Sequence, residues 1–313
     1  MRIGITGICG YVGLALVKRL RDRYDVVGVD NGYKSQLKKI DGVELFDVDI
    51  RDSDSLKKAF NGVDVIIHLA SVTGVDACNE NPDVAFGVNI KGTENVCRVA
   101  GKNGSGLIFA ASMAVYGNPM IIPITELHPR EPVNIYGKQK LLGMEVVRTL
   151  SHMEGFPAFV FVKSNIYGSY IFDGKLITKP TVINKFFMNV TKNEPLRVFS
   201  PGIQKRNFIH VEDVAEAYVK GIEMIENGFE IYNIANSSSV SIAEIAEKIA
   251  DISRKFGFSP KVEYVENPRK DEVVSESFDV DVSKARNELG FEVKRKIEES
   301  IEGMFKITES VSS

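Results

Sequence analysis

Short apolar runs alternate with longer amphipathic runs over the first half of the chain. An apolar run of four to eight residues is typical of a buried strand, and apolar residues three or four apart are typical of a helix. We expect strands at 2–6, 25–30, 43–46, 63–69, 105–111 and 157–163, and helices at 11–21, 53–60, 82–101 and 134–152. Strands that alternate with helices favour parallel pairing, so the pattern predicts an α/β fold with a doubly wound parallel sheet.

The second half is less regular. Amphipathic runs predict helices at 181–191, 211–227 and 241–256. Residues 169–180 are polar and aromatic without a helix or strand period, and we expect a mobile, substrate-contacting loop there.

A glycine-rich turn follows the first predicted strand and opens the first helix. Gly7, Gly10 and Gly13 are spaced three apart, whereas the usual dinucleotide fingerprint has its first two glycines two apart. Such glycines let the backbone approach a pyrophosphate, and the helix N-terminus offers free N–H groups to it. The alternative is a plain turn between a strand and a helix.

Asp30 favours the nucleotide interpretation. It ends the second predicted strand, seventeen residues past Gly13, where a carboxylate accepts hydrogen bonds from the adenosine ribose. The carboxylate would repel a 2′-phosphate, and Asn31 and Gly32 follow it without an arginine. The turn and the acid together predict a Rossmann-type site for NAD rather than NADP.

Tyr136 and Lys140 lie four residues apart in a predicted helix, so their side chains share one face. An ammonium beside a phenol favours the phenolate, and a tyrosine that normally titrates near ~10 then acts as a base closer to neutral pH. Beside a nucleotide site, this pair predicts a hydride-transfer enzyme.

Taken in order, these motifs resemble the extended short-chain dehydrogenase/reductases, and more narrowly the NAD-dependent nucleotide-sugar epimerase/dehydratase group. The resemblance rests on the glycine turn, the Tyr136/Lys140 pair and further segments along most of the chain. These segments are Asp49-Ile-Arg-Asp52, His68-Leu-Ala70, 82–93, Ala111–Gly117, Asn165-Ile-Tyr-Gly168, 194–213 and 281–291.

The resemblance implies an NAD-binding domain at 1–165, to which the chain returns near 208–235, and a mainly substrate-binding, smaller C-terminal α/β lobe at 166–313. It implies catalytic roles for Ser112, Tyr136 and Lys140. The cofactor residues that it implies are Gly7, Gly10, Tyr11, Val12, Gly13, Asp30, Asn31, Asp49, Ile50, Leu69, Ala70, Asn89, Tyr136 and Lys140. Those for the substrate are Ser112, Tyr136, Asn165, Val182, Arg206, Arg269 and Phe278.

The two residues after Ser112 distinguish the reactions of the group. Members that dehydrate or decarboxylate carry acidic residues there, whereas this chain has Met113 and Ala114, which transfer no protons. We therefore expect a 4-epimerase of the UDP-glucose/UDP-galactose type, with tightly bound NAD and a transient 4-keto sugar. The alternatives are a one-way ketoreductase or dehydrogenase and, since the catalytic residues are intact, less readily a non-catalytic NAD-binding sensor.

Three substrate residues have competing interpretations. Arg206 matches a diphosphate contact, and a surface ion pair is its alternative. Arg269 lies in a segment that departs from the group's pattern, which leaves its register open. Phe278 would crowd an N-acetyl group and favour UDP-glucose, and a core position is equally compatible with it.

Composition limits the partners. The net charge of −3 indicates no nucleic-acid partner, and no apolar run approaches the ~20 residues of a membrane span. Cys9, Cys78 and Cys97 have no metal-ligand spacing and argue against a disulfide scaffold, which favours the cytoplasm. By resemblance, the helices at 82–101 and 134–152 pair in a homodimer, and the other partner is a nucleotide sugar.

Overall fold

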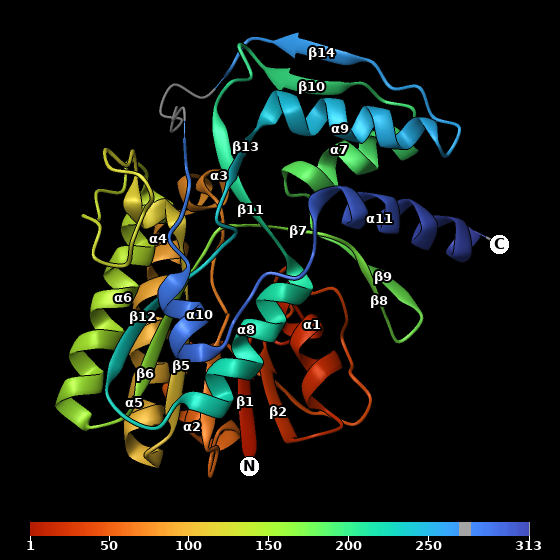
Figure 1. Ribbon diagram of the computed structural model, residues 1–313. Helices are drawn as coiled ribbons and strands as arrows, with labels where there is room; N and C mark the ends of the chain where they lie inside the picture. The colour runs from red at the N-terminus through yellow and green to blue at the C-terminus, as the bar shows by residue number, and fades with distance from the viewer. Residues whose placement is uncertain (269–276, 313) are drawn as a thin grey trace.

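Seven strands of the described chain form one parallel sheet, in the order β12-β6-β5-β4-β1-β2-β3 (Figure 1). The computed structural model describes residues 1–268 and 277–312. The strands are β1 (Arg2–Thr6), β2 (Asp25–Asp30), β3 (Glu44–Asp47), β4 (Val65–His68), β5 (Gly106–Ser112), β6 (Ala158–Lys163) and β12 (Phe229–Ile234). From β1 the chain extends the sheet in one direction to β3, and from β4 it extends it in the other. This reversal between β1 and β4 confirms the doubly wound α/β fold.

Helices cover both faces of this sheet because its strands are apolar on both sides. Along β4, Val65 and Ile67 pack into one core cluster and Ile66 into the other. The first face carries α1 (Tyr11–Leu20) and α8 (Val211–Met224), which pack against each other. The second carries α2 (Ser53–Ala59), α5 (Thr93–Asn103) and α6 (Ile135–Glu154).

The helix expected at 82–101 is present as a continuous helical run over 82–103, but part of it is π-helical. It consists of α4 (Pro82–Phe86), a π-helical segment η1 (Gly87–Gly92) and α5, and the short helix α3 (Val75–Glu80) precedes it. One extra residue per turn in a π-helix shifts the side chains around the axis, and such segments occur often at functional sites. Here Asn89 lies inside η1 and is 4% exposed.

The remaining elements build a smaller lobe with its own core. Helices α7 (Val182–Thr191), α9 (Ile242–Arg254) and α11 (Ile297–Ser312) surround a third apolar cluster, in which Phe187 and Phe305 lie 4.8 Å apart. Its strands are β7 (Asn165–Tyr167), β11 (Lys205–His210) and β13 (Ser239–Ser241), and the pair β10 (Leu196–Phe199) and β14 (Val262–Val265). Helix α10 (Ser283–Leu289) returns to β12 and α8. The exact boundary at residue 165 stays a prediction.

Residues 169–180 do not form the expected irregular loop. They contain an antiparallel hairpin of β8 (Tyr170–Phe172) and β9 (Lys175–Ile177). Tyr170 and Phe172 are 3% and 2% exposed, so their alternation buries one face of the hairpin. Asp173 and Gly174 both have positive φ, the requirement of a two-residue hairpin turn, and this Asp-Gly signal was present in the sequence.

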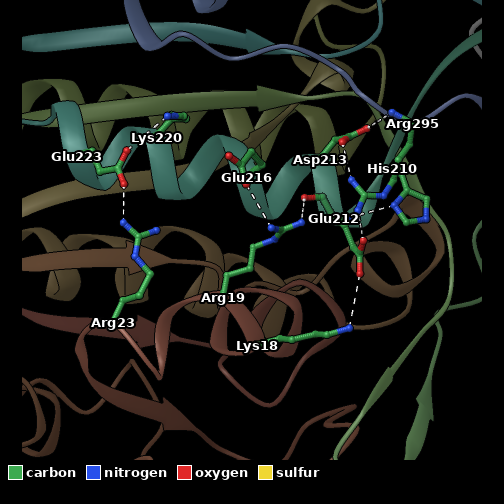
Figure 2. Close-up of polar contacts among 10 residues, drawn as sticks. All are labelled: Lys18, Arg19, Arg23, His210, Glu212, Asp213, Glu216, Lys220, Glu223 and Arg295. Atoms are coloured by element: carbon green, nitrogen blue, oxygen red, sulfur yellow. Dashed lines mark hydrogen bonds and ion pairs between the residues drawn. The ribbon is translucent and has the colours of Figure 1, made fainter.

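Ion pairs connect α1 to α8 across their contact (Figure 2). Arg19 pairs with Glu216 at 3.2 Å and Arg23 with Glu223 at 2.8 Å. Beyond them, Arg295 reaches back to Asp213, whose side chain is 1% exposed, with Nη1 at 3.0 Å and its backbone N–H at 3.1 Å. The C-terminal segment is thereby fixed to the larger domain.

Within 1–268 and 277–312, no helix is long and apolar enough to cross a membrane. The same residues contain no group of three or more metal-binding side chains. Cys9, Cys78 and Cys97 are all buried free thiols.

Candidate active site

The glycine turn lies at the carboxyl end of β1, where the strand order reverses. Gly7 has φ +69°, and a Cβ there would lie 2.9 Å from the Ala70 backbone nitrogen. At Gly13 a Cβ would lie 2.3 Å from the Ile8 carbonyl oxygen. Side chains at either position would therefore displace backbone. Gly10 is the N-cap of α1 and has no side chain to occupy the first N–H groups of the helix, which suits an anion such as a pyrophosphate.

Asp30 lies next to this turn, as the ribose assignment requires. Its carboxylate accepts hydrogen bonds from the backbone N–H groups of Cys9 and Gly32, both at 3.0 Å, and from Ser35 Oγ at 2.5 Å. Anchoring by three donors fixes the orientation of a carboxylate that is still partly accessible. The glycine cradle and the oriented acid together fit the phosphates and the adenosine ribose of a dinucleotide.

Asn31 and Asp49, two of the predicted cofactor residues, contact each other. Asn31 Nδ2 donates to Asp49 Oδ2 at 3.1 Å. Arg51 donates to the same carboxylate from its side chain and lowers the pKa of Asp49 to about 2. The predicted neighbour Ile50 is buried beneath them.

A buried hydrogen-bond chain aligns the loops after β1 and β4. His68 Nδ1 bonds with Thr6 Oγ1 at 2.8 Å and Nε2 with Thr93 Oγ1 at 3.0 Å. Thr6 Oγ1 also accepts from the backbone N–H groups of Leu69 and Ala70, each at 3.1 Å. Burial lowers the pKa of His68 to about 3, so its ring stays neutral and serves as a link in this chain.

The three predicted catalytic residues come together. Ser112 ends β5, and Tyr136 and Lys140 occupy successive turns at the start of α6. The Ser112 hydroxyl lies close enough to the Tyr136 phenol to favour its ionised form, and Lys140 Nζ lies 6.0 Å from the Tyr136 ring centroid. The 5%-exposed Lys140 donates from Nζ to the Ala110 carbonyl at 3.0 Å.

The expected effect of Lys140 on Tyr136 is not found in this structure. Burial raises the pKa of Tyr136 to about 12, and only the nearby Ser112 hydroxyl opposes it among the described groups. Burial also lowers the pKa of Lys140 to about 8. The ammonium bonds to Ala110 instead of the phenol, so desolvation of the phenolate outweighs its attraction to the lysine.

Asn89 connects the π-helical segment to the catalytic helix through Gln139, a residue that sequence reasoning missed. Asn89 Nδ2 donates to Gln139 Oε1 at 2.7 Å and to the Val72 carbonyl at 3.1 Å. Its Oδ1 accepts from the Val72 N–H at 2.9 Å and from Ser71 Oγ at 2.8 Å. Asn89 therefore holds the loop after β4 against α6.

The predicted substrate residues are spread over the smaller lobe and its border. Asn165 lies on β7 and donates to the Asn207 carbonyl at 3.0 Å, while Arg206 lies on the adjacent strand β11. Val182 opens α7. Phe278 is 7% exposed and packs in the core cluster of the second sheet face, the alternative position considered for it. Arg269 lies outside the described residues.

Tyr11 and Val12, predicted at the cofactor, lie in the first turn of α1, where Val12 is partly buried. The Tyr11 hydroxyl donates to the Gly168 carbonyl at 2.5 Å. The Tyr170 hydroxyl donates in return to the Tyr11 carbonyl at 2.5 Å. The cofactor end of α1 is thus tied to the hairpin of the smaller lobe.

Comparison with known proteins agrees with this geometry. The model of the NAD dependent epimerase/dehydratase family matches residues 3–235. The chain is 32% identical to a putative UDP-glucose 4-epimerase of Methanocaldococcus jannaschii, over 95% of each chain. It is 29% identical to UDP-glucuronic acid decarboxylase 6 of Arabidopsis thaliana, over 96% of this chain and 87% of the relative. The crystal structure of a Thermotoga maritima UDP-glucose 4-epimerase with UDP-glucose superposes with a TM-score of 0.90 at 23% identity, over the whole of both chains. The chain therefore belongs to the NAD-dependent epimerase/dehydratase family, and its cofactor is NAD.

Proposed function

We propose that this protein is a nucleotide-sugar 4-epimerase that interconverts UDP-glucose and UDP-galactose. The observation that carries the proposal is the meeting of Ser112, Tyr136 and Lys140 at the end of β5, followed by Met113 and Ala114. Ser112, Tyr136 and Lys140 suit the oxidation and reduction of a sugar carbon. Met113 and Ala114 supply neither an acid nor a base.

In this mechanism Tyr136 takes the proton of the sugar C4 hydroxyl and later returns it. Ser112, whose hydroxyl lies near that of Tyr136, holds the same sugar oxygen. When bound, NAD supplies the hydride acceptor. Lys140 orients the cofactor's ribose, and a shift of its ammonium from the Ala110 carbonyl toward the phenol would favour the phenolate.

Dehydration and decarboxylation need further proton transfer near C5 and C6 of the sugar. The side chain after Ser112 is Met113, which is buried at 5% exposure, and the next is the methyl group of Ala114. Neither exchanges a proton in water. This argues for epimerisation even though decarboxylases are among the relatives of the chain.

The test is to incubate the purified protein, without added cofactor, with UDP-galactose and to measure UDP-glucose. Conversion would establish a 4-epimerase with a resident, recycled cofactor. UDP-glucuronate is assayed in parallel, because relatives act on it. Net change in free NADH with added cofactor, but no conversion without it, would contradict the proposal and indicate a one-way oxidoreductase.

We also propose a homodimer formed through α4 and α6. These helices carry apolar side chains that the monomer leaves in solvent: Val84, Phe86 and Leu142 are 46%, 52% and 47% exposed. Exposed apolar residues clustered on neighbouring elements favour an interface. In analytical ultracentrifugation, the Phe86→Glu variant should have half the particle mass of the unaltered protein. An unchanged mass would contradict this interface.

A further inference from the structure

Lys179 belongs to the smaller lobe, between β9 and α7, yet its ammonium contacts the larger domain. Its Nζ donates to Thr73 Oγ1 at 3.1 Å. Thr73 lies in the loop after β4, three residues past the predicted cofactor residue Ala70. The contact joins residues 106 positions apart in the chain, so a sequence pattern could not have indicated it.

The backbone of Lys179 is fixed from the opposite side of the site. Its carbonyl accepts from Asn184 Nδ2 at 2.9 Å, and Asn184 is 0% exposed. The Asn184 amide also bonds to both backbone groups of Gly168, at 2.8 and 2.9 Å. The Gly168 carbonyl is in turn the acceptor of the Tyr11 hydroxyl at the start of α1.

These two attachments place Lys179 across the point where the strand order reverses. Its backbone is connected through Asn184 and Gly168 to Tyr11 at the start of α1, and its ammonium is held by Thr73 in the loop after β4. Strands β1 and β4 are direct neighbours in the sheet. The crevice between such loops is where a doubly wound sheet receives its dinucleotide, with the pyrophosphate at the N-terminus of the first helix.

The charged groups that act on Lys179 and its neighbour Lys163 are positive. Burial lowers its pKa, and the ammonium of Lys34, four residues past Asp30, lowers it further. Lys163 belongs to the same group of lysines. Its pKa is lowered by burial and by the ammonium groups of Lys140 and Lys179. Within the described part of the chain, the charged neighbours that act on Lys163 and Lys179 are lysines and not carboxylates. Lys163 and Lys179 are each partly exposed, and like charges gathered in one place favour a bound anion.

We propose that Lys179 clamps the pyrophosphate of the bound cofactor, exchanging the Thr73 hydroxyl for a phosphate oxygen. A residue of the substrate lobe thereby retains the dinucleotide, together with the backbone cradle of the glycine turn. This inference rests on the NAD dependence of the family and not on the identity of the sugar, so its test uses binding alone.

The experiment measures the NADH affinity of the full-length chain by fluorescence titration, the displacement of NADH by ADP-ribose and by adenosine, and the binding of UDP, the nucleotide of the sugar substrate, by calorimetry. Because a charge-assisted hydrogen bond to phosphate is lost, Lys179→Met should weaken NADH and ADP-ribose about tenfold to a hundredfold. Adenosine, which has no phosphate, and UDP should bind as before. Lys175→Met, an exposed lysine of the same hairpin, is the matched control and should change none of the four affinities.

Two further variants complete the test. Lys179→Arg should keep NADH affinity within about threefold, since it retains the charge, and Thr73→Val should not weaken it, since Thr73 gives up its contact on binding. Unchanged NADH affinity in Lys179→Met would overturn the proposal. So would a loss of UDP affinity alone, which would assign Lys179 to the substrate. If Lys179→Met also weakened adenosine binding, Lys179 would be maintaining the structure of the site and not contacting phosphate. That result would overturn the proposal as well.

Discussion

Asn89 donates a 2.7 Å hydrogen bond to Gln139, and this bond connects the π-helical segment to the helix that carries Tyr136 and Lys140. Both side chains are buried, at 4% and 3% exposure. The catalytic helix is therefore positioned from the side of the cofactor loops, through groups that take no part in the chemistry.

Gln139→Met would remove this contact while keeping the length of the side chain. The Asn89 amide would lose one acceptor inside the core, and we expect the free energy of unfolding to fall by about 1–3 kcal/mol. Because α6 would lose a fixed contact, kcat should fall more than KM rises. Urea unfolding and steady-state kinetics measure the two effects. The exposed neighbour Lys138→Met is the control, and equal behaviour of the two variants would contradict a positioning role.

Tyr136→Phe should abolish proton transfer without disturbing the cofactor. We expect kcat to fall by about 10²- to 10⁴-fold, the usual contribution of a general acid–base group. NADH affinity should stay within about threefold of the unaltered chain. Tyr264→Phe, at a tyrosine that is 53% exposed, should leave both quantities unchanged. Retention of activity in Tyr136→Phe would remove this residue from the mechanism.

Arg295→Met should destabilise the protein through Asp213. The carboxylate is 1% exposed and, of the two contacts described here with Arg295, would keep only the one with its backbone N–H. Because Arg295 itself is a third exposed, we expect a loss of about 2 kcal/mol of unfolding free energy, below the cost of breaking a fully buried pair. Arg23→Met, which breaks an exposed pair with Glu223, should cost much less than Arg295→Met. Adding Asp213→Asn to Arg295→Met should recover part of the loss, and no recovery would contradict the charge argument.

Stability should decrease below neutral pH because two histidines are buried as neutral rings. Burial lowers the pKa of His68 to about 3 and that of His210 to about 4, against about 6.5 in the unfolded chain. The unfolded state therefore binds more protons as pH falls from about 6.5 toward 4, and stability is lost through that window. Replacing His210 by Asn, which keeps a capping side chain for α8, should reduce the slope near pH 5 by about 1.4 kcal/mol per pH unit.

Urea unfolding between pH 4.5 and 7 measures this slope. The exposed His152→Asn is the matched control and should reproduce the slope of the unaltered chain. A slope in His210→Asn equal to that of the control would show that His210 is protonated in the folded state.

The sequence predicted the elements whose signal is local. The six apolar runs of the first half became β1 to β6 because a strand buried on both faces is apolar throughout. Tyr136 and Lys140 lie on successive turns of one helix, so their spacing alone placed them on one face. Ser112 was added through the resemblance of the segment Ala111–Gly117 to the family.

What the sequence could not predict depends on contacts between distant segments. The π-helical segment around Asn89 could not be recognised from periodicity, since the apolar pattern runs through 82–101 unbroken. The Asn89–Gln139 bond spans 50 positions and the Lys179–Thr73 bond 106. The pKa of Tyr136 depends on its burial as well as on Lys140, and the spacing of two side chains gives no measure of that burial.

The reciprocal bonds of Tyr11 and Tyr170 have a consequence for recombination between relatives. Each hydroxyl bonds to a backbone carbonyl on the other's side of the lobe border, so the two tyrosines form a matched pair separated by more than half the chain. A chimaera that imports a foreign substrate lobe while keeping the native N-terminal half would match only one member of this pair. Lobe exchange should therefore succeed when the first turn of α1 is transferred together with the hairpin. The unit that must be exchanged is thus encoded by two separate stretches of the gene.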